Sequence, residues 1–178
     1  MKKLFYLIFA ILSAALILNS CSYNYKSNSD NEFEVVADTL SVKVVPKIKG
    51  VVSDYEELFT EGEIKGLTEK CNGFKNTNAT PVAIFTSGNI GDFNNFTEYA
   101  DAVSTKWNGC EENQGLLFVI SNSLGEVRLI SCSVTESRIT DDDFNYVVND
   151  ILYGAFRNNK FYDGIIESLD YLNEKIKK

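Results

Sequence analysis

The residue types that could carry out chemistry in this chain are carboxylates, tyrosines, lysines and cysteines, because its 178 residues contain no histidine. The absence of histidine excludes Ser-His-Asp and Cys-His catalysis, and also zinc sites that use imidazole. Acid–base chemistry would therefore fall to carboxylates, tyrosines, lysines or metal-bound water. With 25 acidic and 17 basic residues, the formal net charge is −8. This balance disfavours nucleic acid as a partner, since phosphates are bound by lysine and arginine.

Cys21 is the cysteine whose position predicts a reaction. Lys2 and Lys3 precede an apolar run from Leu4 to Leu18. The run is too short for a membrane span, which needs roughly 20 residues, but it suits a secretory signal. It ends in Leu18-Asn19-Ser20-Cys21, which resembles a bacterial lipobox, where the cysteine thiol receives lipid and becomes the mature N-terminus. The alternative is a soluble signal peptide with an incidental cysteine.

The N-terminal sequence predicts a location as well as a modification. We expect residues 1–20 to be a lipoprotein signal peptide and Cys21 to anchor the protein to a membrane through acyl chains. The expected location is the bacterial cell envelope, and Ser22 favours the outer membrane over the inner one. Residues 21–47 are expected to form a flexible tether, because polar residues dominate the first dozen. Within this segment, residues 35–45 contain enough β-branched residues for a short strand or an extended lead-in, but no pairing partner is obvious. The folded domain is expected to span residues 48–178.

The expected domain alternates between apolar segments typical of buried strands and amphipathic segments typical of helices. Helices are expected over residues 61–74, 94–107, 141–156 and 160–176. Strands are expected over residues 81–86, 116–121 and 127–131, the last two joined as a hairpin by Asn122-Ser123-Leu124-Gly125. This order predicts an α/β fold in which helices cover a mixed β-sheet.

Short motifs along this domain resemble those of the TPM domain family, which is also described as TPM phosphatase-like. They are, in chain order, Val52-Ser53-Asp54-Tyr55, Tyr99-Ala100 with Trp107, Gln114-Gly115-Leu116-Leu117, Val127-Arg128-Leu129-Ile130, Glu136 with Ile139-Thr140-Asp141, and Phe156-Arg157 with Tyr162-Asp163-Gly164-Ile165. The resemblance covers residues 46–176, and its weight comes from the order and spacing of the motifs. It implies a central mixed β-sheet of few strands, flanked by helices on both faces.

The resemblance also places three carboxylates, Asp54, Glu136 and Asp141, around one end of the sheet, with Asp142 adding negative charge beside them. Oxygen ligands from several loops suit Ca²⁺ or Mg²⁺, and a bound cation could polarise a phosphate or activate water. These residues have structural alternatives. Asp54 could bond the backbone amides of a turn, and the acidic residues after Thr140 could cap a helix. A cap there does not exclude a cation on Asp141.

Two loops depart from the family pattern, and each carries a cysteine. Cys132-Ser133-Val134 stands where the family has a Gly-aromatic-Gly turn, and Asn108-Gly109-Cys110 where it usually has Gly-Ile-Gly. Because the resemblance makes these loops neighbours, Cys110 and Cys132 could form a disulfide in an oxidising envelope. Cys71 instead lies on the apolar stripe of an expected helix, which predicts a small buried side chain.

Two functions are compatible with these features. The first is a divalent-cation-binding interaction or accessory module, tethered to the membrane, that assists other envelope proteins. The second is a metal-dependent phosphatase that acts on phosphomonoesters or phosphoproteins and needs Asp54, Glu136 and Asp141 in one pocket. The altered turn at residues 132–134 favours the first, since valine does not easily adopt the backbone conformations open to glycine.

Overall fold

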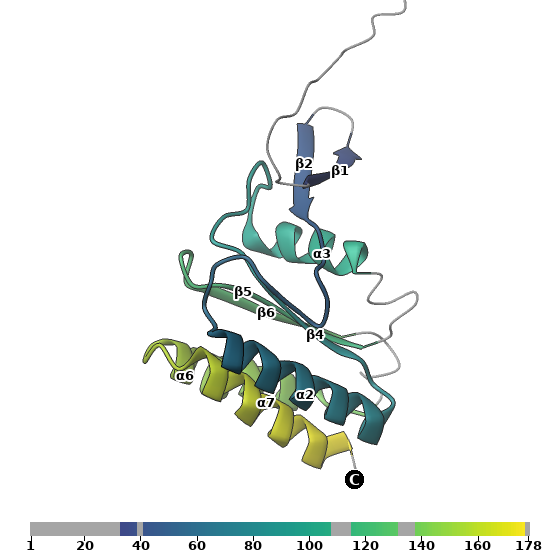
Figure 1. The fold of residues 1–178 in the computed structure, drawn as a ribbon, viewed down its shortest axis with the longest axis vertical. Helices are drawn as coiled ribbons and strands as arrows, with labels where there is room; N and C mark the ends of the chain where they lie inside the picture. The colour runs from purple at the N-terminus through teal and green to yellow at the C-terminus, as the bar shows by residue number, and fades with distance from the viewer. Residues whose placement is uncertain (1–32, 39–40, 108–114, 132–137, 177–178) are drawn as a thin grey trace, which may run out of the picture. The chain divides into compact units, whose positions relative to one another are not determined.

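The computed structural model describes residues 33–38, 41–107, 115–131 and 138–176, with side chains from residue 43 onward. Glu32–Lys178 forms one compact unit of the chain. Its centre is a four-stranded sheet with helices on both faces (Figure 1). The expected α/β fold with a central mixed sheet is therefore confirmed.

The sheet is built from β3 (Val52–Asp54), β4 (Val82–Thr86), β5 (Leu116–Ser121) and β6 (Glu126–Ser131), in that spatial order. The first three strands are parallel, and β6 returns antiparallel to β5. Every residue of β4 and β5 is buried, which explains why both strands read as continuous apolar segments rather than alternating ones. Gly125, with a φ of 67°, allows the tight turn into β6.

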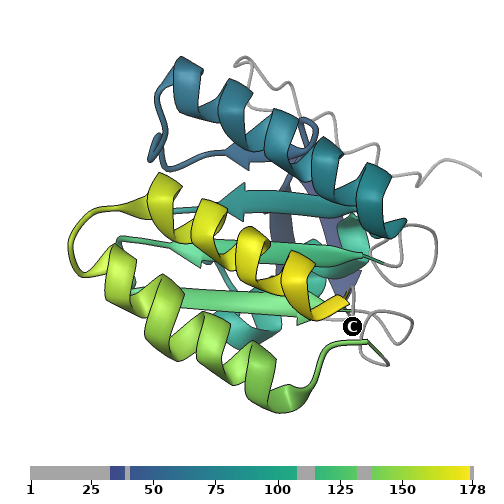
Figure 2. The same cartoon turned by 90° about the horizontal axis from the view of Figure 1, so that it is seen from below.

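One face of the sheet is covered by α2 (Glu61–Asn78), α7 (Phe161–Ile176) and a third helix between β6 and α7 (Figure 2). The third helix has three parts: α5 (Asp141–Tyr146), a π-helical turn η2 (Val147–Leu152) and α6 (Tyr153–Phe156). The other face carries α3 (Phe96–Lys106). The four helices expected from the sequence are thus present, and the one over residues 141–156 contains a π-helical turn that periodicity alone did not predict.

Two hydrophobic clusters hold the layers together. Between the sheet and the three helices, fully buried side chains such as Leu67, Leu116 and Leu169 pack on one another. On the opposite face, Phe85 and Val119 of the sheet pack against α3 residues that include Val103. Cys71 belongs to the first cluster and is 2% exposed, which confirms its expected place as a small core residue.

The segment before the sheet differs from its expected form. β1 (Phe33–Asp38) and β2 (Ser41–Pro46) pair as an antiparallel hairpin. Val45 is fully buried in the cluster around α3, and Lys43 forms an ion pair with Glu98 of that helix. Residues 33–38 and 41–46, which lie within the expected tether, are thus two paired strands, so the short strand considered over residues 35–45 has a partner within the same segment. Burial of the apolar Val45 side chain against α3 stabilises the packing of the hairpin on the domain.

In the part of the chain that the structure describes, no helix is both long and apolar enough to cross a membrane.

Candidate functional site

Polar side chains end three neighbouring strands at the same edge of the sheet. Asp54 ends β3, Thr86 ends β4 and Ser121 ends β5. The register places Asp54 opposite Thr86, and Thr86 opposite the last-but-one residue of β5. In open α/β sheets, ligands bind at the carboxyl ends of parallel strands. In this fold, a functional site is therefore expected at this carboxyl edge.

The carboxylate of Asp54 is engaged by the protein itself. Its Oδ1 accepts hydrogen bonds from the Thr86 hydroxyl and from the backbone N–H of Leu58, at 3.2 Å in the second case. Its Oδ2 accepts from the backbone N–H of Phe59 at 2.9 Å. The Thr86 Oγ1 in turn accepts from the N–H groups of Tyr55 and Glu56, at 2.9 and 3.0 Å. Asp54 therefore organises the turn between β3 and α2, as its structural alternative predicted.

Glu56 has a similar task, which the sequence analysis missed. Its carboxylate accepts hydrogen bonds from the N–H of Asn122 at 2.9 Å, from the N–H of Ser123 at 2.6 Å and from the Ser123 hydroxyl. These contacts join the turn after β3 to the β5–β6 turn. The partners are 66 and 67 residues away in sequence, so no local spacing could have revealed them.

Asp141 and Asp142 lie at the other end of the sheet. The Arg138 guanidinium donates a hydrogen bond, 2.9 Å long, to the carbonyl oxygen of Asn78, the last residue of α2. Asn78 precedes the start of β4, whereas Asp54 faces the end of β4. Figure 2 shows α5 starting at the end toward which the β6 arrow points, which is opposite to the arrowheads of the parallel strands β3, β4 and β5. The expected grouping of Asp54 with Asp141 and Asp142 around one end of the sheet is therefore wrong.

This separation rules out one cation site that uses all the expected ligands. β4 has five residues, and at about 3.3 Å per residue the Cα atoms of its first and last residues are about 13 Å apart. Oxygen ligands bind Ca²⁺ at about 2.4 Å, so ligands of one ion lie within about 5 Å of each other. Among the residues that the structure describes, no three acidic or cysteine side chains are grouped closely enough to hold a metal ion. Glu136 lies outside the described residues.

Near Asp141, the carboxylate with the strongest interactions is Asp143. It forms a capping box with Thr140 at the start of α5, and its Oδ1 is 2.8 Å from both the Lys175 Nζ and the Tyr171 hydroxyl. The hydrogen bonds from Lys175 first, and then from Thr140 and Tyr171, hold the pKa of the Asp143 carboxyl well below its usual value. Asp143 therefore links the start of α5 to the end of α7 through Lys175 and Tyr171. The cap interpretation of residues 140–143 is confirmed.

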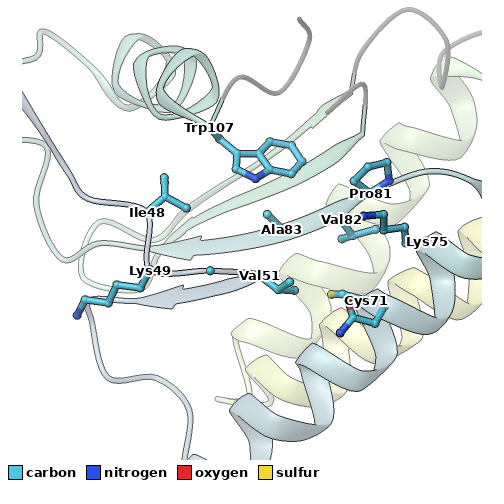
Figure 3. A pocket seen from close by; sticks show the side chains of 11 residues that line it. Ile48, Lys49, Val51, Cys71, Lys75, Pro81, Val82, Ala83 and Trp107 are labelled. Carbon is cyan, nitrogen blue, oxygen red and sulfur yellow. The ribbon is translucent and has the colours of Figure 1, made fainter. Parts of the chain in front are cut away.

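A cavity of about 360 Å³ lies beside the starts of β3 and β4 (Figure 3). Val51, Val82 and Ala83 form its apolar wall, the Trp107 ring lies across from them, and Lys75 lies at its rim. Cys71 also lines this space, but burial raises the pKa of its thiol to about 12. The group is therefore a neutral thiol at physiological pH, and the described lining contains no carboxylate. The arrangement does not suit acid–base or nucleophilic chemistry.

A second cavity, of about 460 Å³, opens at the carboxyl edge. It lies between Val44 and Pro46 of the hairpin, Tyr55 after β3, the loop after β4 and Tyr99 of α3. The Tyr99 hydroxyl is buried and has no hydrogen-bond partner among the described residues. Burial raises the pKa of Tyr99 to about 12, an effect that the neighbouring Ser87 hydroxyl partly offsets. Tyr99 is therefore a protonated donor at this cavity.

Three cysteines with expected roles fall outside the described residues: Cys21, Cys110 and Cys132. Lipid attachment to Cys21 and a disulfide between Cys110 and Cys132 remain predictions.

Comparison with known proteins bears on the whole domain. The sequence matches the TPM domain family from residue 52 to residue 175, and this match covers more than half of the chain. The protein belongs to this family. The match begins after the β1–β2 hairpin, so the hairpin precedes the part of this TPM protein that the family model describes. A search of curated proteins finds no match.

Solved bacterial structures share the TPM fold of this chain. The solution structure of the N-terminal domain of a P. gingivalis protein has a TM-score of 0.62 at 19% identity, covering 71% of this chain and 82% of that one. The BA42 protein of Bizionia argentinensis has a TM-score of 0.58 at 13% identity, with 69% and 84% covered. An N-terminal domain from Corynebacterium glutamicum gives 0.56 at 12% identity, with 79% and 86% covered. At these identities, the likeness concerns the fold.

Proposed function

We propose that this TPM protein is a membrane-tethered accessory module of the bacterial cell envelope, which binds other envelope proteins through the carboxyl edge of its sheet. The observation that carries the proposal is that the carboxylates of Asp54 and Glu56 are hydrogen-bonded to the protein's own loops. Their carboxylates hold the turn after β3 against β4 and against the β5–β6 turn. The edge is thereby built as a fixed surface.

A fixed edge suits recognition for a thermodynamic reason. Loops that are already ordered lose little conformational entropy when a partner binds, so more of the contact energy appears as affinity. The β5–β6 turn also presents Leu124, whose side chain is 46% exposed. An exposed apolar side chain on an ordered turn is the kind of feature that contributes to protein interfaces.

The membrane tether in this proposal rests on the sequence. Cys21 after the apolar run would carry the lipid, and the chain up to the hairpin would hold the domain at the membrane surface. Such an anchor needs no spanning helix. It would keep the carboxyl edge close to other proteins of the same membrane, which raises their effective concentration.

The alternative function, a metal-dependent phosphatase, fits the geometry less well. It needs Asp54, Glu136 and Asp141 in one pocket, and Asp54 and Asp141 lie at opposite ends of the sheet. The oxygens of Asp54 are also engaged by three donors of the protein. We therefore derive no phosphatase mechanism from this arrangement.

Photo-crosslinking in cells tests the proposed edge. A photoreactive amino acid replaces exposed Leu124 in one variant, and replaces exposed Glu174 near the end of α7 in a control variant. We expect a discrete adduct with an envelope protein from position 124 and none from position 174. Adducts from both positions, or from neither, would contradict the proposal that the carboxyl edge is the binding surface.

A further inference from the structure

The cavity at the carboxyl edge is lined by apolar and uncharged polar residues. Its volume is about 460 Å³, and Val44, Pro46 and the ring of Tyr55 give it apolar walls. Its polar groups come from Ser87 and Asn89, and no charged side chain belongs to the described lining. Pockets of this size, mostly apolar with a few placed polar groups, are typical of ligand sites.

The Tyr99 hydroxyl is the observation that points to a ligand. The Tyr99 ring is enclosed by Phe85, Phe93 and Phe96, with ring centroids 5.3 to 6.4 Å away. A phenylalanine would fill this aromatic cluster equally well. The tyrosine instead buries a hydroxyl that makes no hydrogen bond of normal geometry with the described residues, in a residue that is 1% exposed, although burial raises its pKa and the Ser87 hydroxyl lies close enough to lower it in part. An unpaired buried donor costs free energy, so a ligand that accepts its hydrogen bond would recover that cost.

The donors and the walls together define the ligand. The Tyr99 hydroxyl is protonated and offers a hydrogen bond, and the Asn89 side-chain oxygen already accepts one from the N–H of Gly91 at 3.2 Å. The Ser87 hydroxyl already donates to the Asn89 carbonyl at 2.8 Å. The site therefore needs an acceptor oxygen beside an uncharged apolar group, which is the chemistry of an apolar amino-acid residue and its backbone carbonyl.

We propose that this cavity binds one apolar residue of a partner polypeptide, whose backbone carbonyl accepts a hydrogen bond from the Tyr99 hydroxyl. The inference rests on the proposed function for the nature of the partner. It adds a specific pocket that the hairpin completes, since Val44 and Pro46 precede the residues matched by the TPM family. A charged residue is rejected because no counter-charge lines the pocket.

NMR titration of the isotopically labelled chain from Ser22 onward tests this pocket. The probe is N-acetyl-leucine methylamide, and its matched control is N-acetyl-aspartate methylamide, which has a side chain of similar shape but carries a charge. We expect the leucine probe to shift the amide signals of Gly88, Asn89 and Gly91, with a dissociation constant of about 1 mM for so small a ligand. The aspartate probe should bind at least about tenfold more weakly.

Two conservative variants identify the role of the hydroxyl. Tyr99→Phe removes only the oxygen and should weaken the leucine probe at least about threefold, because one hydrogen bond is lost. Tyr146→Phe, on an exposed tyrosine of α5, should leave binding unchanged. The free Tyr99→Phe protein should melt at the same or a higher temperature than the original, because it no longer buries an unpaired hydroxyl.

Other results would overturn the inference. They are an absence of shifts at about 10 mM leucine probe, equal binding of the two probes, or full affinity in Tyr99→Phe. A lower melting temperature of free Tyr99→Phe would show that the hydroxyl is already bonded, for example by a trapped water. Loss of the Leu124 crosslink with probe binding retained would overturn only the proposed function. A retained crosslink without probe binding would overturn only this inference.

Discussion

Asp54 and Glu56 are two residues apart, yet their carboxylates join different loops. Asp54 bonds the turn that follows it and the Thr86 hydroxyl, whereas Glu56 bonds the β5–β6 turn. A carboxylate that accepts several backbone N–H groups contributes to order at its site. At the residue scale, Asp54, which was expected to bind a cation, therefore has a structural task, and Glu56 has a similar one.

Asp143 offers a test at the residue scale through pH. Its pKa in the folded protein is held below the ordinary value, chiefly by Lys175. The stabilisation is therefore present above the ordinary aspartate pKa of about 3.9 and is lost as the pH falls below it. We expect Asp143→Asn to be less stable than the original protein at pH 7, with the difference shrinking between pH 5 and about pH 3.

Urea unfolding at a series of pH values measures this effect. Asp142→Asn is the matched control, because Asp142 is the exposed neighbour of Asp143 at the same helix start. A difference between Asp143→Asn and the original protein that stays constant from pH 7 to pH 3 would contradict the role given to the Lys175 pair.

At the scale of elements, the sequence predicted most of the helices and strands. The continuous apolar segments at residues 116–121 and 81–86 are strands because both faces of β4 and β5 are buried. The helix at residues 141–156 was predicted, but its π-helical turn was not, since that depends on packing rather than on periodicity. Residues 35–45 were considered as one short strand without a partner, whereas the segment folds back on itself as β1 and β2.

The arrangement of the candidate site depended on chain direction, which single residues do not show. β6 runs antiparallel to β5, so the chain leaves the sheet at the end opposite to Asp54 before α5 begins. The β5–β6 hairpin was predicted from its turn, Asn122 to Gly125. The motif resemblance nevertheless grouped the carboxylates at one end, because the order of motifs along a chain does not specify their positions in space.

At the scale of elements, alanine substitutions at two glycines are expected to change the free energy of unfolding in opposite directions. A Cβ on Gly115, at the entrance of β5, would lie 2.1 Å from the Pro81 carbonyl oxygen, whereas a Cβ on Gly73 in α2 would meet nothing within 4 Å. Gly115→Ala should therefore lower the free energy of unfolding by about 1–3 kcal/mol or more. Gly73→Ala should raise it by about 0.5–1 kcal/mol, because alanine is the better helix former.

Chemical denaturation of the two single variants checks this pair. Gly115→Ala with the stability of the original protein would show that β4 and β5 do not approach as closely as the structure has them. A destabilised Gly73→Ala would contradict the open surroundings of that position.

At the scale of the whole molecule, the hairpin extends the folded domain, and the predicted lipid on Cys21 would attach it to a membrane. The hairpin docks on α3 through Val45 and Lys43, ahead of the residues that match the TPM family. The folded unit thus starts before the family match, and a shorter chain beginning at residue 48 would lose a wall of the carboxyl-edge cavity.

Lipid attachment has a direct test in cells. Because the thiol of Cys21 would be acylated, the original protein should incorporate labelled palmitate and sediment with membranes, and Cys21→Ser should do neither. Cys71→Ser is the matched control for a cysteine in the core, although it will lower stability. Palmitate incorporation that persists in Cys21→Ser would contradict the lipoprotein assignment.

The central claim is that the carboxylates of the carboxyl edge bind the protein's own loops. Thermal unfolding of the chain from Ser22 onward in EDTA and in millimolar Ca²⁺ or Mg²⁺, with and without Asp54→Asn, tests it most directly. We predict that Asp54→Asn lowers stability by about 1–3 kcal/mol, equally in EDTA and in either cation, because the amide has one acceptor oxygen where the carboxylate has two and at least one donor loses its acceptor. A cation that raises the melting temperature of the original protein but not of Asp54→Asn would contradict the claim, since stabilisation by mass action would reveal a cation on Asp54.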